Sequence, residues 1–333
     1  MSLDLLRPFL RPIEPLLLDD DVSEIMGNPN ATWYAERGGE MLPLPDVSFD
    51  AGSLRTGLEV IANNLGKRLD EDNPVLEAQL PDGSRICAYI PPAVKPAPGL
   101  TIRKFTGRRF TIDDLIARGT LTRSLADFLA DEIQAGKTLL ISGGTGTGKT
   151  TLLNVLAHAI PDDERIVTIE DTAELLIHKP NIVGFECQNE TFKQPVSFEK
   201  LLKVALRCRP DRIILGEVRG TEARTLLDSL NTGHSGSLAT IHASSAAKAL
   251  HRFANLVLRS HQQTSFEDAE AEIGEAVDYV VHIERHHGRR IVREVLRISE
   301  YDRAAQQFET EVVYDSGTDT HGNPGQYAFP FFE

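Results

Sequence analysis

Residues 143–150, with the sequence Gly-Gly-Thr-Gly-Thr-Gly-Lys-Thr, constrain this 333-residue chain more than any other feature. Their spacing is that of a phosphate-binding loop, in which a glycine and four further residues precede Gly-Lys-Ser/Thr. An apolar run of strand length, residues 138–142, comes before the loop, and a helix is predicted after it over residues 151–159. Strand, loop and helix therefore follow in the order that such a loop requires. The residues expected to contact a nucleotide are Gly143, Gly144, Thr145, Gly146, Thr147, Gly148, Lys149, Thr150 and Thr151.

The residue types of this segment suit a triphosphate. Glycines let the backbone curl without Cβ clashes, so that successive N–H groups and the positive end of the next helix converge on an anion. Lys149 adds a mobile cation for the β- and γ-phosphates, and the Thr150 hydroxyl is a ligand for Mg²⁺. The alternative, a glycine-rich turn with a chance lysine, does not account for the flanking strand and helix. ATP and magnesium are thus the expected cofactors.

Beyond residue 119, short apolar runs of β-rich composition alternate with helical patterns. Strands are predicted at residues 166–169, 182–185, 212–215 and 237–241. Helices are predicted at residues 198–206, 222–230, 246–258 and 266–276. This alternation predicts an α/β fold, a mainly parallel sheet with helices on both faces. The phosphate loop would lie at the carboxyl edge of that sheet, where ligands bind. A hairpin with a basic tip, residues 285–290, is expected near the end.

A smaller α/β domain is predicted before this core. Two β-hairpins are expected, one around Gly38-Gly39 and one across residues 81–83, and a helix is expected over residues 54–65. The length of the chain also favours two domains. We predict an N-terminal α/β domain at 1–105, a linker at 106–119, an ATPase domain at 120–315 and a loosely ordered tail at 316–333.

The net charge, the length of the apolar runs and the cysteine content limit where in the cell the protein is expected and which classes of partner it is expected to bind. A formal net charge of −14 disfavours direct contact with nucleic acid, because nucleic acid is a polyanion. No run approaches the roughly 18 apolar residues of a transmembrane span, and the N-terminus does not read as a signal peptide. Three scattered cysteines suggest a reducing compartment. A cytoplasmic protein is expected.

Hydrolysis also needs an acid that holds magnesium or orients the attacking water. Glu217 follows the predicted strand 212–215, and three acids, Glu170, Asp171 and Glu174, follow the strand 166–169. A carboxylate at the carboxyl end of such a strand faces the phosphates. Glu217 could instead be a solvated residue at a strand end, and at least one of the other acids could simply favour a helix N-terminus.

Two histidines and a group of arginines lie near these acids in the sequence. His234 and His242 flank the strand 237–241, and each alone reads more readily as a structural residue than as a metal ligand. Arginines near a triphosphate can neutralise the charge of a transition state, although such a group is usually a solvated face. The arginines are Arg207, Arg209, Arg212 and Arg219.

With these pieces in place, the chain resembles the secretion traffic ATPase superfamily, the motors of type II and type IV secretion, conjugation and pilus assembly. Four blocks carry the resemblance: the phosphate loop, an acidic box at 168–175, the segment 206–220 and a histidine box at 232–243. Residues 21–26, 80–85 and 100–105 look like the N-terminal domain of the conjugation and Tad-pilus branch. The three scattered cysteines cannot form the four-cysteine zinc insertion of the extension-motor branch.

The resemblance implies roles for individual residues. Glu174 would be the catalytic glutamate that polarises water, Glu217 the acid near magnesium, and His242 the residue that senses the γ-phosphate. Arg85 and Arg103 would close over the nucleotide from the N-terminal domain. Arg209 and Arg219 are weaker candidates for contacts at a subunit junction.

The resemblance also implies a RecA-like core, a homohexamer and work on inner-membrane secretion or pilus machinery, with the protein peripheral to that membrane. Two alternatives remain open at this point. A DNA motor on the same core is disfavoured by the acidic balance of the chain. A nucleotide-dependent scaffold without turnover is less attractive because both candidate acids, Glu174 and Glu217, are present.

Overall fold

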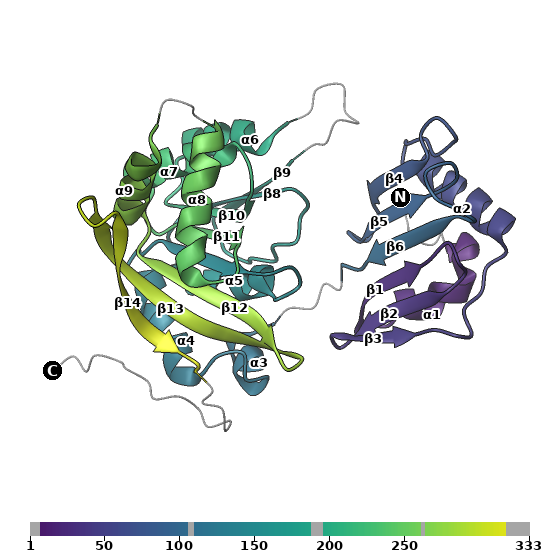
Figure 1. Ribbon diagram of the computed structural model, residues 1–333, viewed down its shortest axis with the longest axis horizontal. Helices are drawn as coiled ribbons and strands as arrows, with labels where there is room; N and C mark the ends of the chain where they lie inside the picture. The colour runs from purple at the N-terminus through teal and green to yellow at the C-terminus, as the bar shows by residue number, and fades with distance from the viewer. Residues whose placement is uncertain (1–6, 106–109, 188–195, 261–263, 318–333) are drawn as a thin grey trace. The chain divides into compact units, whose positions relative to one another are not determined.

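The structure, a computed structural model, describes residues 7–105, 110–187, 196–260 and 264–317 (Figure 1). The chain divides into two compact units, Met1–Arg108 and Arg109–Glu333. The predicted linker at 106–119 is wrong in part, because Ile112–Ala117 forms helix α3 within the second unit. A capping box between Thr111 and Asp114 begins this helix, since each residue's side chain bonds the other's backbone N–H. Residues 106–109 and most of the predicted tail, 318–333, lie outside the described residues.

The first unit contains, in its described residues, a six-stranded antiparallel sheet in the order β3-β2-β1-β6-β5-β4. Both predicted hairpins are confirmed, and Gly38 and Gly39 adopt the positive φ that a tight two-residue turn requires. The strands are β1 (Val22–Gly27), β2 (Trp33–Arg37), β3 (Glu40–Pro43), β4 (Val75–Gln79), β5 (Arg85–Tyr89) and β6 (Gly99–Arg103).

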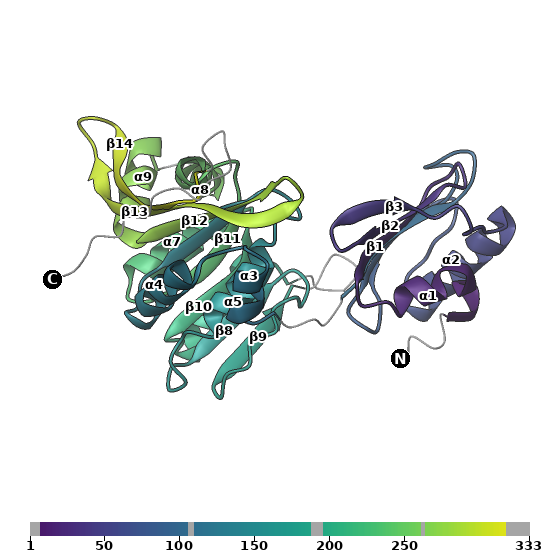
Figure 2. The same cartoon turned by 90° about the horizontal axis from the view of Figure 1, so that it is seen from below.

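Helices α1 (Glu14–Leu17) and α2 (Ala51–Asn64) cover one face of this sheet (Figure 2). Side chains alternate along each strand, so that Ile86 and Ile102 are buried with Leu58 and Ile61 of α2. Asp50 caps α2 by accepting the Ser53 N–H. The other face of the sheet therefore presents the intervening residues of β5 and β6.

The second unit contains, among its described residues, an eight-stranded sheet in the order β14-β13-β12-β7-β11-β10-β8-β9. The six strands from β12 to β9 are parallel, and β13 and β14 continue the sheet in antiparallel fashion. The strands are β7 (Leu139–Gly143), β8 (Ile166–Glu170), β9 (Ile182–Glu186), β10 (Arg212–Val218), β11 (Leu238–His242), β12 (Tyr279–His286), β13 (Arg289–Asp302) and β14 (Gln307–Asp315).

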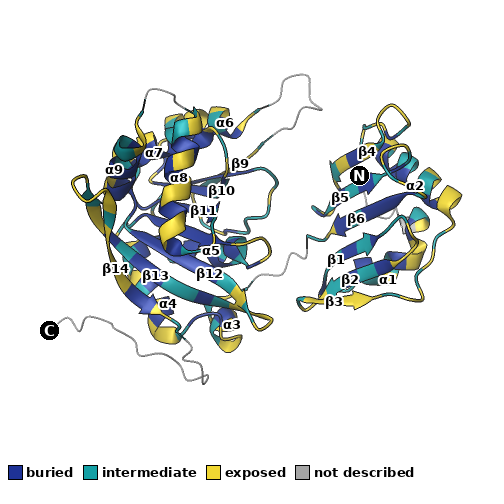
Figure 3. Ribbon diagram, in the orientation of Figure 1, coloured by how far each residue is buried: buried dark blue, intermediate teal, exposed yellow. Residues whose placement is uncertain are grey.

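Helices pack on both faces of this sheet, as the alternating pattern predicted. The central strands are buried on both sides (Figure 3). In β7, Leu140 faces one core, whereas Leu139 and Ile141 face the other. The core that contains Leu140 is completed by helices α6 (Phe198–Ala205), α7 (Glu222–Asn231), α8 (Ala246–Ser260) and α9 (Phe266–Ala276). The opposite core is completed by helices α3, α4 (Arg123–Gln134) and α5 (Lys149–Ala157).

Candidate functional site

The phosphate-binding loop joins β7 to α5, as predicted. β7 ends at Gly143 and α5 begins at Lys149, with Gly148 as its N-cap at φ 98°. Gly143 is packed against the next strand, because a Cβ atom there would lie 2.3 Å from the carbonyl oxygen of Ile283. Gly146, at φ 69°, has open space around its α-carbon. The glycines therefore serve different purposes: two permit left-handed backbone, and Gly143 permits a close approach.

Lys149 is buried at the first position of α5 and bonds to its own loop. Its ammonium donates to the carbonyl oxygen of Gly143 at 3.1 Å and to that of Gly144 at 2.8 Å. The hydroxyl of Thr147 also donates to the Gly144 carbonyl, at 3.0 Å. These hydrogen bonds direct the Gly143 carbonyl toward Lys149, and the Gly144 carbonyl toward both Lys149 and Thr147. Thr150 and Thr151 lie partly buried in the first turn of α5.

Glu217 is presented by a β-bulge near the carboxyl end of β10. Leu215 pairs with Ala239 and Val218 with Ile241, so β10 carries one extra residue relative to β11. Such a bulge re-aims a side chain, and bulges are frequent next to active sites. Burial raises the pKa of the Glu217 carboxyl, and the Lys149 cation opposes that rise. Glu217 therefore lies close enough to Lys149 of the phosphate loop to interact with it electrostatically.

His242 ends β11 and lies between Glu217 and Lys149. Its Nε2 is 3.2 Å from Oε1 of Glu217, and its Nδ1 is 3.4 Å from the Lys149 ammonium. Burial and the Lys149 charge lower the pKa of the imidazole. Three residues singled out in the sequence thus meet at the carboxyl edge of three neighbouring parallel strands, β7, β11 and β10.

Glu170, at the end of β8, organises the segment that carries Glu174. Its buried carboxylate accepts the backbone N–H groups of Glu174, at 2.9 Å, and Leu175, at 2.8 Å. Burial raises the pKa of Glu170 to about 7, against the effect of these two hydrogen bonds. The negative charge of Glu174 also contributes to the raised pKa of Glu217.

Asn154 of α5 ties the same segment to the helix that follows the phosphate loop. Its amide nitrogen donates to the Glu174 carbonyl at 3.2 Å, and its oxygen accepts the Leu176 N–H at 2.8 Å. Asn154 is not among the residues predicted from the sequence. An asparagine at the fifth position after a Gly-Lys pair carries no signal of its own, because its partners lie 20 or more residues away.

The arginines of the segment 206–220 lie at two different edges of the sheet. Arg219 follows β10 at the carboxyl edge and forms an ion pair with Asp171. Arg209 is exposed, at φ 54°, just before β10 begins. The phosphate loop follows the end of β7, which is parallel to β10 within the same sheet, so Arg209 lies at the opposite edge from the loop of its own chain.

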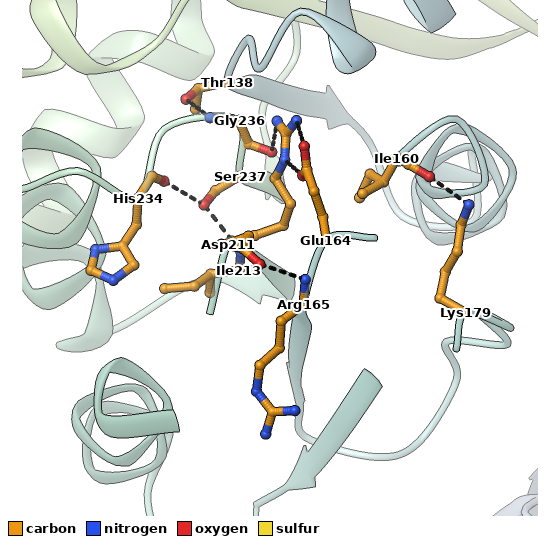
Figure 4. A network of polar contacts seen from close by, with 11 residues as sticks. Thr138, Ile160, Glu164, Arg165, Lys179, Asp211, Ile213, His234, Gly236 and Ser237 are labelled. Atoms are coloured by element: carbon orange, nitrogen blue, oxygen red, sulfur yellow. Dashed lines mark hydrogen bonds and ion pairs between the residues drawn. The ribbon is translucent and has the colours of Figure 1, made fainter. Parts of the chain in front are cut away.

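A polar network occupies that opposite, amino edge (Figure 4). Arg212, only 4% exposed, pairs with Glu164 and donates to the Gly236 carbonyl at 3.2 Å. Asp211 accepts the Arg165 N–H at 2.7 Å, and Thr138 accepts the Gly236 N–H at 3.1 Å. These residues precede or begin β7, β8, β10 and β11, so the network joins the starts of four strands. Arg212 has a structural role there.

The first unit brings Arg85 and Arg103 together. They are directly paired on β5 and β6, and Glu24 of β1 pairs with Arg103 on its other side. The Arg103 guanidinium lies 3.8 Å from the Glu24 carboxylate and is half exposed. Both arginines lie on the sheet face opposite α2, because their neighbours Ile86 and Ile102 point to the core.

Arg290 is a further residue at the phosphate loop that the sequence analysis did not single out. It lies in β13, and its Nε donates to the Gly146 carbonyl at 3.2 Å. It belongs to the basic tip noted in the sequence, but the sequence does not show which cation of that tip faces the loop.

A strand, a glycine-rich loop and a helix that together surround a buried lysine, with a histidine and a carboxylate at the ends of adjacent strands, are typical of nucleotide-hydrolysing enzymes. The family described as "Type II/IV secretion system protein" matches residues 10–296. The chain belongs to this family, and it is an ATPase of the type II/IV secretion group.

Individual relatives agree with this membership. The probable conjugal transfer protein TrbB of Sinorhizobium fredii is 35% identical over 309 residues, which cover 91% of each chain. The type IV secretion system protein VirB11 of Bartonella henselae is 34% identical over 325 residues, which cover 86% of this chain and 91% of the relative. The solved structure of the ATPase DotB of Legionella pneumophila superposes with a TM-score of 0.58 at 21% identity, covers 92% of this chain and 84% of that chain, and supports the fold.

Proposed function

We propose that this chain is a hexameric ATP-hydrolysing motor that powers type IV secretion, conjugative transfer or pilus assembly from the cytoplasmic face of the inner membrane. Membership of the family and the relatives named for conjugal transfer and type IV secretion support the cellular role. The second unit would be a RecA-like core, in keeping with the phosphate loop at the carboxyl edge of its mainly parallel sheet. Helices of the described ranges include none that is long and apolar enough to cross a bilayer.

The observation that carries the proposal is the convergence of Lys149, His242 and Glu217. Contacts of 3.4 and 3.2 Å join them in a row across β7, β11 and β10. In this proposal the loop N–H groups and Lys149 hold the β- and γ-phosphates, and His242 contacts the γ-phosphate. Glu174, held by Glu170 and Asn154, orients the attacking water.

The protein groups near the loop fit a magnesium ion. In nucleotide sites Mg²⁺ takes one or two protein ligands and completes its shell with phosphate oxygens and water. Thr150 and Glu217 would be those ligands, and the ion would neutralise charge on the phosphates. Across the residues that the structure describes, no group of three or more histidine, cysteine or acidic side chains forms a metal cage of its own.

The remaining arginines are proposed as supporting contacts. Arg85 and Arg103 would bind nucleotide phosphates from the first unit, since two cations side by side on one sheet face suit an anion. Arg209 is proposed to act only on the nucleotide of a neighbouring subunit, because it lies at the opposite edge from its own loop. Arg219, paired with Asp171 near that loop, is proposed for a subunit junction.

Steady-state phosphate release with Mg-ATP tests the proposal. We expect Lys149→Ala and Glu174→Gln each to lower kcat by about 100-fold or more, as is usual when a principal catalytic group is removed. Lys200→Ala and Glu309→Gln are matched controls, because both residues are exposed and distant in sequence from the loop. Wild-type rates in the first two variants would refute the assignments. A strict monomer in sedimentation with nucleotide present would refute the hexamer.

A further inference from the structure

The hairpin of β12 and β13 passes beside the phosphate loop as well as along the sheet. β12 pairs in parallel with β7, with Ile283 opposite Gly143, so the hairpin continues past the point at which β7 turns into the loop. Beyond that point, Arg285 pairs with Arg290 and His286 with Arg289. Beyond the end of β7 the hairpin therefore carries four cationic or titratable side chains, in a protein that is acidic as a whole.

Of these, Arg290 contacts the loop in two ways. Its Nε donates to the Gly146 carbonyl, and its Cδ lies 3.3 Å from the place that a Cβ of Gly148 would occupy. The aliphatic part of Arg290 thus lies over Gly148, and a side chain at position 148 would crowd it. A β-bulge follows this contact along β13: His282 pairs with Glu294 and Ile283 with Val292, so β13 carries an extra residue beyond the segment that holds Arg290.

The bond to Gly146 has a consequence for the loop because a peptide group is planar. The carbonyl of Gly146 and the N–H of Thr147 belong to one peptide unit and point in opposite directions in its trans form. A donor that holds the carbonyl outward therefore directs the Thr147 N–H to the opposite side. Inside the loop, the side chains of Thr147 and Lys149 hold the carbonyls of Gly143 and Gly144. Arg290 holds the Gly146 carbonyl from another strand.

We infer that Arg290 is a positioning residue for nucleotide binding: it fixes the Gly146–Thr147 peptide so that the Thr147 N–H is ready to donate to a phosphate oxygen. This inference rests on the proposed nucleotide site and adds to it a residue outside the loop. A preorganised donor does not have to be reoriented when the anion binds, so the advantage is realised in affinity for nucleotides that carry a β-phosphate.

Arg290→Met tests the inference, since methionine retains much of the aliphatic chain and removes the donor. We expect the Kd for ATP and for ADP, measured by calorimetry on the full chain, to rise about tenfold, the effect of one hydrogen bond with a charged donor. KM for ATP should rise in parallel, with kcat at saturation within about twofold of the wild-type value. Arg290→Lys, which restores a cationic donor, should recover most of the lost affinity.

Arg289→Met is the matched control. It removes the same charge from the same hairpin, one residue away, and successive strand residues point to opposite faces. Its Kd values should equal those of the wild type, and the nucleotide-free melting temperatures of all three variants should agree with the wild-type value within about 2 °C, as expected for surface substitutions.

An unchanged Kd in Arg290→Met would overturn the inference, and so would an equal loss in Arg289→Met, which would indicate a general charge effect. A wild-type protein that binds no ATP would instead overturn the proposed function. If the wild type binds ATP and Lys149→Ala does not, the comparison of Arg290→Met with Arg289→Met decides the inference.

Discussion

The Nε2 atom of His242 lies 3.2 Å from the carboxylate oxygen Oε1 of Glu217. The other ring nitrogen faces the ammonium of Lys149, which can only donate, so Nδ1 is the acceptor and Nε2 carries the proton. The lowered pKa of His242 agrees with a neutral ring at pH 7. The imidazole therefore links a cation of the loop to a carboxylate of the neighbouring strand. We expect a ligand that draws Lys149 away to change the hydrogen bonding of Glu217.

Substitution of Glu217 and of Glu174 should separate their roles. We expect Glu217→Gln to raise the Mg²⁺ concentration for half-maximal ATPase activity by about tenfold. The reason is that the proposed metal ligand loses its negative charge, and a neutral amide oxygen binds Mg²⁺ more weakly than a carboxylate. Glu174→Gln should lower kcat and leave the Mg²⁺ requirement within about twofold of the wild-type value, as expected for a group that acts on the water. Magnesium titrations of the steady-state rate measure both. The assignment would be wrong if the two variants exchanged these behaviours.

Substitution of Glu170 should stabilise the protein at high pH. Because burial raises its pKa from 4.5 to about 7, the folded state binds a proton that the unfolded chain releases between these values. Stability from this group is therefore full below pH 4.5 and is lost as the pH rises through about 7. We expect Glu170→Gln to gain about 1 to 3 kcal/mol over the wild type at pH 8, and little at pH 5. Melting temperatures at both pH values measure the difference.

Glu186→Gln is the control for this experiment. Glu186 is exposed, pairs directly with Glu170 across β8 and β9, and makes the smallest named contribution to its raised pKa. Its substitution should produce a much smaller shift in the same direction. Equal stabilisation of both variants at pH 5 and pH 8 would show that burial of Glu170 is not the cause.

Adjacent glycines of the loop should respond differently to alanine. In Gly143→Ala the new Cβ would meet a backbone oxygen, that of Ile283, at 2.3 Å, which no rotamer change can relieve. In Gly144→Ala the nearest atom, Thr147 Cγ2, lies at an ordinary 3.6 Å. We expect Gly143→Ala to lose about 1 to 3 kcal/mol of nucleotide-free stability and Gly144→Ala less than about 1 kcal/mol. Equal melting temperatures in the two variants would contradict this.

Removal of the Asn154 side chain should affect turnover more than binding. Asn154→Ala breaks both hydrogen bonds that hold the Glu174–Leu176 segment against α5. We expect kcat to fall about five- to tenfold, because Glu174 is less well oriented, with the ATP Kd within about twofold. His158→Ala, at the exposed C-cap of α5, should change neither. A Kd effect as large as the kcat effect would place Asn154 in binding instead.

Much of the second unit follows from local pattern. Strands buried on both faces read as continuous apolar runs, so β7, β8 and β11 were predicted within one residue of their observed bounds, whereas β10 was predicted at 212–215 and extends to Val218, so that Glu217 lies within it. β14 was not predicted, because most of its residues are exposed and its sequence has no clear apolar pattern. Its strand conformation is stabilised by antiparallel pairing with β13. Helix α3 was missed although its capping box, Thr111 to Asp114, is a readable signal.

The residues of the candidate site also divide into those that the local sequence pattern predicts and those that it does not. Lys149, Glu217 and His242 stand next to strand ends, and strand ends of one parallel sheet meet at one edge. Arg290 could not be chosen from its basic neighbours, because its bond to Gly146 spans 144 residues. Arg209, which the resemblance implied as a weaker candidate for a subunit junction, lies at the opposite edge from the loop of its own chain, because the seven-residue length of β10 separates the two edges.

The contact between Gly143 and Ile283 has a mechanical meaning. With no side chain between the two backbones, there is no compressible layer to absorb a displacement of β12. A force applied to the hairpin of β12 and β13 would therefore reach the phosphate loop through this contact, without passing through the rest of the sheet.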